Sequence, residues 1–176
     1  MTLISNGRGG WRDAEQTPVI IAGTMVTSDL ARARRFYEYY LRFDCVQHEP
    51  GKLLVRDKRA ADLMRRGERG GFVIEVEEVA EIKNRQKMNH HWGFDVESIE
   101  EVDRMRKVAL DDGKKYGIKR VIPITKTHGS YQFFFSDMDD NWWEIEYRMH
   151  GRSNEMVIEG GDFERKEEAA MDQEQL

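Results

Sequence analysis

The sequence has a single cysteine, Cys45, among its 176 residues. One cysteine excludes an internal disulfide and a cluster of thiolate ligands within one subunit, so any bound metal must be held by nitrogen and oxygen. Long hydrophobic runs are also missing, because no apolar stretch approaches the roughly 18 residues that a membrane helix needs. Residues 1–18 lack the hydrophobic core of a signal peptide. These absences predict a soluble, cytoplasmic protein with no membrane partner.

A surplus of positive charge is also missing. Charged residues make up 35% of the chain, but the net charge is −5 and the sequence has no basic stripe of the kind that holds nucleic acid. Nucleic-acid partners are therefore disfavoured. The chain does contain 39% apolar and 10% aromatic residues. That content can bury one good core, and the length suits one domain or two small fused modules.

The two ends of the chain are polar and have no apolar period. Residues 1–17 contain scattered glycines and predict a flexible arm, whereas residues 151–176 are rich in charge and predict a solvated tail. Between them lies the expected folded body. It divides into a first module at residues 18–80 and a second module at residues 81–150.

The first module follows the order strand, helix, three strands. An apolar run at residues 19–26 fits a buried strand, and Ser28 with Asp29 can cap a helix whose apolar residues recur at helical spacing. Three short extended pieces complete the module, at residues 45–48, 53–55 and 72–76.

The second module repeats this order. Residues 91–96 predict a strand, Ser98 and Glu101 form a capping box at the start of a helix, and Gly113 is expected to end that helix. Three further strands are expected at residues 120–124, 130–136 and 142–147. The repetition supports an internal duplication. The predicted fold class is α+β, built from two tandem βαβββ modules.

Several segments occur in an order found in one known superfamily. They are Asp29-Leu30 leading to Phe36-Tyr37, then Tyr40-Leu41-Arg42-Phe43, and Asp137-Met138-Asp139-Asp140-Asn141 ahead of Glu144. With these segments the chain resembles the vicinal oxygen chelate superfamily, which includes glyoxalase I, extradiol dioxygenases, and fosfomycin and bleomycin resistance proteins. The resemblance implies a curled mixed sheet with a central cleft and a divalent cation at its floor. It also implies a homodimer that binds a small-molecule substrate.

The same resemblance implies three metal ligands. His91 opens the second module and matches the family's histidine, Glu144 matches the carboxylate after the acidic turn, and Glu75 matches the carboxylate that ends the first module. A further family histidine is replaced by Ala22 or Ile21, depending on the alignment, and neither can bind metal. Nitrogen and oxygen ligands suit Fe(II), Mn, Zn, Ni or Mg, and the choice among them stays open.

Strand phase adds candidates for catalysis and substrate binding. Trp142 and Glu146 share the face of Glu144 because side chains alternate along a strand. We take His128 and Glu146 as catalytic candidates, and Tyr131 and Trp142 as substrate-binding candidates. An exposed loop position without a catalytic role is the alternative for His128.

These residues favour a metalloenzyme of the vicinal oxygen chelate type. The aromatic residues with polar groups incline the prediction towards an extradiol dioxygenase-like oxidoreductase acting on a small aromatic or vicinally oxygenated substrate. The missing histidine favours the runner-up, a glyoxalase-like or epimerase-like isomerase or lyase. Two alternatives remain: a metal-free binding protein of the bleomycin-resistance type, and a dimerising scaffold.

Overall fold

The computed structural model describes residues 3–5, 11–13, 22–68, 71–127 and 129–149. The chain splits into two compact units, one of which is the folded body Val19–Met149. In the other unit, the described residues form two short strands, β1 (Leu3–Ser5) and β2 (Trp11–Asp13), which pair antiparallel. The sequence did not predict this pairing, because its residues have no strand alternation.

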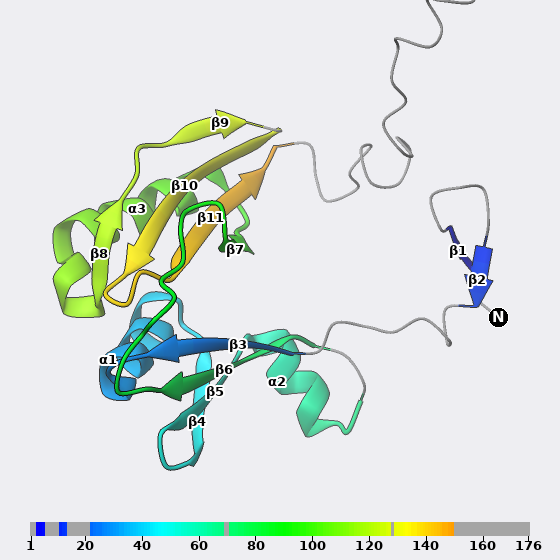
Figure 1. Ribbon diagram of the computed structural model, residues 1–176. Coiled ribbons are helices and arrows are strands. Elements are labelled where there is room, and N and C mark those ends of the chain that lie inside the picture. The colour runs from blue at the N-terminus through cyan, green and yellow to red at the C-terminus, as the bar shows by residue number, and fades with distance from the viewer. Residues whose placement is uncertain (1–2, 6–10, 14–21, 69–70, 128, 150–176) are drawn as a thin grey trace, which may run out of the picture. The chain divides into compact units, whose positions relative to one another are not determined.

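The first module is a four-stranded sheet with a helix on it (Figure 1). Its elements are β3 (Ala22–Thr27), α1 (Leu30–Arg35), the π-helical turn η2 (Phe36–Tyr40), β4 (Asp44–Glu49), β5 (Lys52–Arg56), α2 (Lys58–Arg65) and β6 (Val73–Glu78). The strand order is β3-β6-β5-β4. The first strand pairs parallel with the last, and the other pairs are antiparallel.

The second module repeats this topology. Its elements are β7 (His91–Asp95), α3 (Ile99–Tyr116), β8 (Ile118–Val121), β9 (Thr125–Thr127), β10 (Ser130–Asp137) and β11 (Trp142–Arg148). The order is β7-β11-β10-β8, with β9 paired to β10, and the first strand again pairs parallel with the last. The predicted α+β fold with two βαβββ modules is therefore confirmed. The modules form two separate mixed sheets rather than one, and α2 and β9 are additions to the pattern.

The helix boundaries follow local capping chemistry. Asp29 caps α1 by accepting a hydrogen bond from the backbone N–H of Arg32 at 2.9 Å, and Ser98 caps α3 through the N–H of Glu101 at 3.2 Å. The predicted end of α3 at Gly113 is wrong. Gly113 is buried against Ile118, whereas Gly117 takes a left-handed φ of +77° and ends the helix.

One hydrophobic core joins the two modules. The rings of Phe36 and Tyr37, from η2, lie 5.6 Å and 5.8 Å from that of Trp143 on β11. Tyr40 packs edge-on against Phe135 and donates a hydrogen bond from its hydroxyl to the carbonyl of Met105, on α3. These contacts place η2 of the first module against the face of the second sheet that α3 also covers. The two modules therefore share one set of buried side chains.

The acidic turn between β10 and β11 also ties the modules together. The Asp139 carboxylate accepts hydrogen bonds from Thr27 and Ser28, both at 2.6 Å, and from Arg32 at 2.9 Å and 3.0 Å. Burial raises the pKa of Asp139, but the bonds from Ser28, Thr27 and Arg32 outweigh it and hold that pKa below its ordinary value. The neighbouring Asp140 has a positive φ of 64°, as does Arg42 with 59°.

Within the described residues, no helix is long and apolar enough to cross a membrane.

Candidate metal centre

His91 and Glu144 meet on the face of the second sheet that points away from α3, which we call the polar face. In the parallel pairing of β7 with β11, His91 lies opposite Trp142 and Glu144 opposite Gly93. The imidazole Nε2 of His91 is 3.2 Å from a carboxylate oxygen of Glu144. The side chain of Glu144 is 12% exposed, whereas that of His91 is 31% exposed. The predicted pair is thus brought together where solvent reaches only one side of it.

The imidazole is oriented by the segment that precedes β7. Its Nδ1 lies 2.7 Å from the carbonyl oxygen of Met88. A carbonyl only accepts, so Nδ1 must carry a hydrogen, and Nε2 is the ring nitrogen that is directed at Glu144. The ring of Phe134, 4.9 Å away, contacts the imidazole in a T-shaped arrangement. A backbone carbonyl that fixes the far nitrogen is the typical support of a metal-binding histidine.

The Nε2 of His91 and the Glu144 carboxylate can share one positive charge between them. Burial and the negative charge of Glu146 raise the pKa of Glu144, and the neighbouring His91 opposes this rise. A proton is therefore one way to supply the positive charge. A divalent cation is another. With metal–ligand distances of about 2.1 Å, two donors on one cation are about 3.0 Å apart in cis octahedral and about 3.4 Å apart in tetrahedral geometry. The observed 3.2 Å fits this range.

Gly93 keeps the space beside the pair open. A Cβ atom on this residue would lie 3.3 Å from a carboxylate oxygen of Glu144 and 3.8 Å from one of Glu146. Any side chain here would therefore push on the Glu144 carboxylate, so glycine preserves its position.

Glu146 is buried and already has hydrogen-bond partners. It accepts from the Ser130 hydroxyl at 2.8 Å and from two guanidinium nitrogens of Arg148, at 3.1 Å and 2.9 Å. These bonds fix the carboxylate next to Glu144. Glu146 therefore contributes a fixed negative charge to the polar face rather than a free ligand.

Glu75 does not join His91 and Glu144 within one chain. It lies on β6 in the first sheet, where a carboxylate oxygen is 3.5 Å from the Nε2 of His48. In the described part of the chain, no group of three or more histidine, cysteine, aspartate or glutamate residues is placed to hold a metal ion. Ala22, at the position of the absent histidine, opens β3, and Ile21 lies outside the described residues.

The remaining predicted residues have different outcomes. Trp142 lies on the polar face, opposite His91, and is 6% exposed. Tyr131, the other substrate-binding candidate, lies on the opposite face: alternation along β10 turns it towards α3, where its hydroxyl donates to Asp103 at 2.8 Å. His128 lies outside the described residues.

Two supports of the pair were missed by the sequence reasoning. Phe134 could have been found, because it pairs directly with Glu144 across β10 and β11 and so shares its face. The Met88 carbonyl could not have been found, because its direction depends on the path of the irregular segment before β7.

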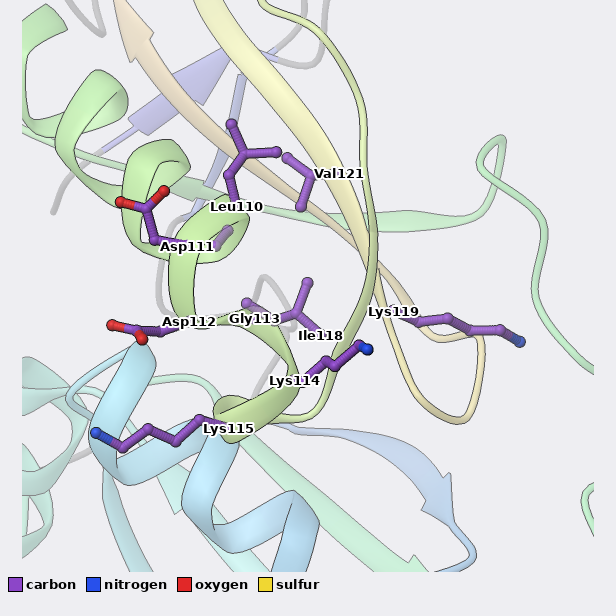
Figure 2. A pocket seen from close by; sticks show the side chains of 10 residues that line it. Leu110, Asp111, Asp112, Gly113, Lys114, Lys115, Ile118, Lys119 and Val121 are labelled. Atoms are coloured by element: carbon purple, nitrogen blue, oxygen red, sulfur yellow. The ribbon is translucent and has the colours of Figure 1, made fainter.

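The cavity shown in Figure 2, about 530 Å³, lies elsewhere, at the end of α3 and the start of β8. The side chains of Lys115 and Lys119 point away from it in opposite directions, and those of Asp111 and Asp112 lie on one side. Its polar groups do not converge on a common point. The cavity therefore offers no site to compare with the His91–Glu144 pair.

Comparison with known proteins gives a family and several similar folds. The model of the Glyoxalase/Bleomycin resistance protein/Dioxygenase superfamily matches residues 20–145. No protein of curated function matches the sequence.

Among solved structures, a possible glyoxalase from Bacillus cereus is 22% identical, with a TM-score of 0.56 over 73% of this chain and 98% of that one. A mutant of the fosfomycin resistance protein FosX from Listeria monocytogenes, in complex with Mn(II) and 1S,2S-dihydroxypropylphosphonic acid, is 16% identical. Its TM-score is 0.56 over 80% of this chain and 96% of that one. At these identities the likeness shows the fold alone.

Proposed function

Because the chain belongs to the Glyoxalase/Bleomycin resistance protein/Dioxygenase superfamily, we propose that it is a divalent-metal-dependent enzyme acting on a small molecule with neighbouring oxygen atoms. The observation that carries this proposal is the His91–Glu144 pair, two donors 3.2 Å apart with the histidine already oriented. The FosX neighbour, whose structure contains Mn(II) and a diol, supports the same class of ligand.

The roles of the residues follow from their surroundings. His91 and Glu144 would hold the cation, which would polarise substrate oxygens and stabilise the negative charge that develops on them. Glu146, fixed by Ser130 and Arg148, keeps a second negative charge beside the pair. Trp142 forms an apolar wall next to His91. His128 stays a candidate proton donor or acceptor on the sequence prediction alone.

A second copy of the chain would complete the ligand set. One chain offers two ligands on the polar face, and a cation in a catalytic site commonly has three from the protein. Glu75 is a suitable third, because its side chain is 37% exposed on the first sheet, on the face opposite the one packed against α1. We therefore expect a homodimer in which Glu75 of one copy approaches His91 and Glu144 of the other.

The donor set favours chemistry without a change of oxidation state. The iron sites of oxygenases commonly use two histidines and one carboxylate, whereas the described residues place one histidine beside Glu144. An isomerase, lyase or addition reaction is thus favoured over the dioxygenase-like activity expected from the sequence. Oxygen uptake in the presence of Fe(II) and catechols distinguishes the two.

A metal-free binding protein is the second candidate function. It is favoured by a specific observation, namely that the described residues of one chain supply two donors and not three. For a binder of this kind, His91→Ala would leave the affinity for its ligand nearly unchanged. For the enzyme, the same substitution removes metal binding and turnover together.

The direct test is calorimetric titration of metal-stripped protein with Mn(II), Zn(II), Ni(II), Co(II), Mg(II) and anaerobic Fe(II). We expect saturable binding of at least one ion by the wild type, and at least a tenfold loss of affinity in His91→Ala and Glu144→Gln. His90→Ala is the matched control, because His90 is exposed and lies next to His91 in the chain. Equal binding by all four proteins would reject the proposed site.

The shared site has its own test. His91→Ala and Glu75→Gln are each expected to lose metal binding as pure dimers. When they are mixed and allowed to exchange subunits, about a quarter of the sites should recover, because each mixed dimer contains one intact site. If no site recovers while mixed dimers form, Glu75 is not the third ligand. A strictly monomeric protein would give the same answer.

A further inference from the structure

A second cavity, of about 330 Å³, lies between the two modules, on the side of β7 away from the His91–Glu144 pair. Val55 and Ile74, on β5 and β6, are its buried apolar residues, and four aromatic side chains complete the lining. These are Phe43, Phe72, Trp92 and Phe94. Because residues alternate along β7, Trp92 and Phe94 point into this cavity and His91 into the polar face. Gly93 lies between this cavity and the Glu144 carboxylate.

The cavity is partly open to solvent, and its walls are mainly apolar. A cavity of this size is at the lower end of the range for small-molecule sites, about 300–1,000 Å³. It is about twice the ~150 Å³ of an engineered apolar cavity that binds benzene. A molecule of two fused rings is therefore the matching size.

The rings are held in place before any ligand enters. Phe72 and Trp92 have ring centroids 5.1 Å apart with a tilt of 32°, and Phe43 meets Phe94 edge-on at 5.2 Å. Gly23, on β3, allows the close approach of the indole, because a Cβ there would be 2.7 Å from the ring of Trp92 and 3.1 Å from that of Phe72. Flat aromatic surfaces in fixed positions favour a flat aromatic partner.

The charged groups at the cavity already have partners. The Arg56 guanidinium forms a salt bridge with Asp44 at 2.8 Å, and the Asp57 carboxylate accepts from the N–H of Ala60 at 2.6 Å as the cap of α2. Neither offers a free charge to a ligand. A charged ligand would lose its hydration without a counter-ion in return, which is costly in an apolar cavity.

We propose that this cavity is a second binding site and that it takes a neutral, planar aromatic molecule of about two fused rings. The site is separate from the metal centre, since it uses the opposite face of β7 and different side chains. It does not depend on the proposed enzymatic activity.

The experiment uses the full chain labelled with 5-fluorotryptophan and followed by fluorine NMR, with the Trp92 resonance assigned through Trp92→Phe. The probes are indole, which is neutral, and indole-3-acetate and tryptamine, which carry the same ring with a negative or positive charge. We expect indole to shift the Trp92 resonance saturably and to leave Trp142, on the polar face, unchanged. Both charged probes should bind at least tenfold more weakly.

Two variants locate the binding. Val55→Phe fills the buried part of the cavity and should abolish the indole shift, and Phe72→Ala, at a half-buried position, should weaken it at least tenfold. Val46→Phe is the control, because Val46 is 40% exposed on the other face of the same sheet. No saturable shift in the wild type, equal binding of the charged probes, or unchanged binding in Phe72→Ala would each overturn the proposal. So would a crystal structure in which another part of the chain or a second copy fills the cavity.

Discussion

The sharpest stability prediction concerns Asp139, the carboxylate that joins the acidic turn of the second module to the first. Replacing it with alanine removes four hydrogen bonds, two from the hydroxyls of Thr27 and Ser28 and two from Arg32. Thr27 is 1% exposed and would keep one weaker acceptor, the carbonyl of Asp29 at 3.1 Å. Arg32 is 25% exposed and would turn to water.

The magnitude follows from these surroundings. Removing one partner of a buried, charged network costs about 3–5 kcal/mol, because the other partners stay buried without compensation. Water can reach Arg32, so we expect the lower end, about 3 kcal/mol. For a body of this size, that corresponds to a fall in Tm of about 10 °C.

Urea unfolding monitored by tryptophan fluorescence and circular dichroism measures the difference. The unfolding free energy of Asp139→Asn should lie between those of the wild type and Asp139→Ala. The amide oxygen can still accept hydrogen bonds, but the side chain has no charge to pair with Arg32. Asp112→Ala, on the exposed side of α3, is the control and should match the wild type. A loss below about 1 kcal/mol in Asp139→Ala would refute the reasoning, because it would mean that the network adds no more than an exposed ion pair.

Three further predictions follow from single residues. Burial raises the pKa of Asp137 to about 6, although Asn141 donates hydrogen bonds to its carboxylate. The folded protein therefore holds this proton more tightly than the unfolded chain does, and the resulting stabilisation is present at pH 4 and is lost as the pH rises to 6. Asp137→Asn should remove this downward slope, of about 2–3 kcal/mol, from the curve of unfolding free energy against pH. Gly93→Ala should weaken metal binding several-fold in calorimetry while the circular dichroism spectrum stays unchanged, because the new methyl presses on Glu144. Arg42 has a φ of 59°, so Arg42→Gly should be more stable than Arg42→Ala by about 1 kcal/mol in urea unfolding; equal stabilities would show that the turn carries no strain.

The features that the sequence predicts well are those that depend on local alternation and capping. The phase of β7 and β11 placed His91 and Glu144 on one face, and the parallel pairing of these strands then brings them together. The caps at Asp29 and Ser98 were predicted because a capping side chain acts within its own first turn. Arg42 and Asp140 both have a positive φ, a backbone conformation that glycine adopts far more readily than other residues.

The features that the sequence could not predict depend on how the modules pack. Glu75 was expected as a metal ligand with His91 and Glu144 from the family resemblance, and the sequence left open whether the two modules pair within one chain or across two. In the structure, η2 packs against the back of the second sheet, and Glu75 pairs with His48 instead. The end of α3 was misplaced for a similar reason, since only the contact with Ile118 explains why Gly113 stays helical.

The central claim is that His91 and Glu144 bind one divalent cation. The measurement that tests it most directly is an anomalous difference map from a crystal soaked in Mn(II) and recorded near the manganese absorption edge. We expect one strong peak, about 2.1–2.3 Å from both the Nε2 of His91 and a carboxylate oxygen of Glu144. A map in which the ion binds elsewhere, or in which these two side chains remain in direct contact with no peak between them, would contradict it.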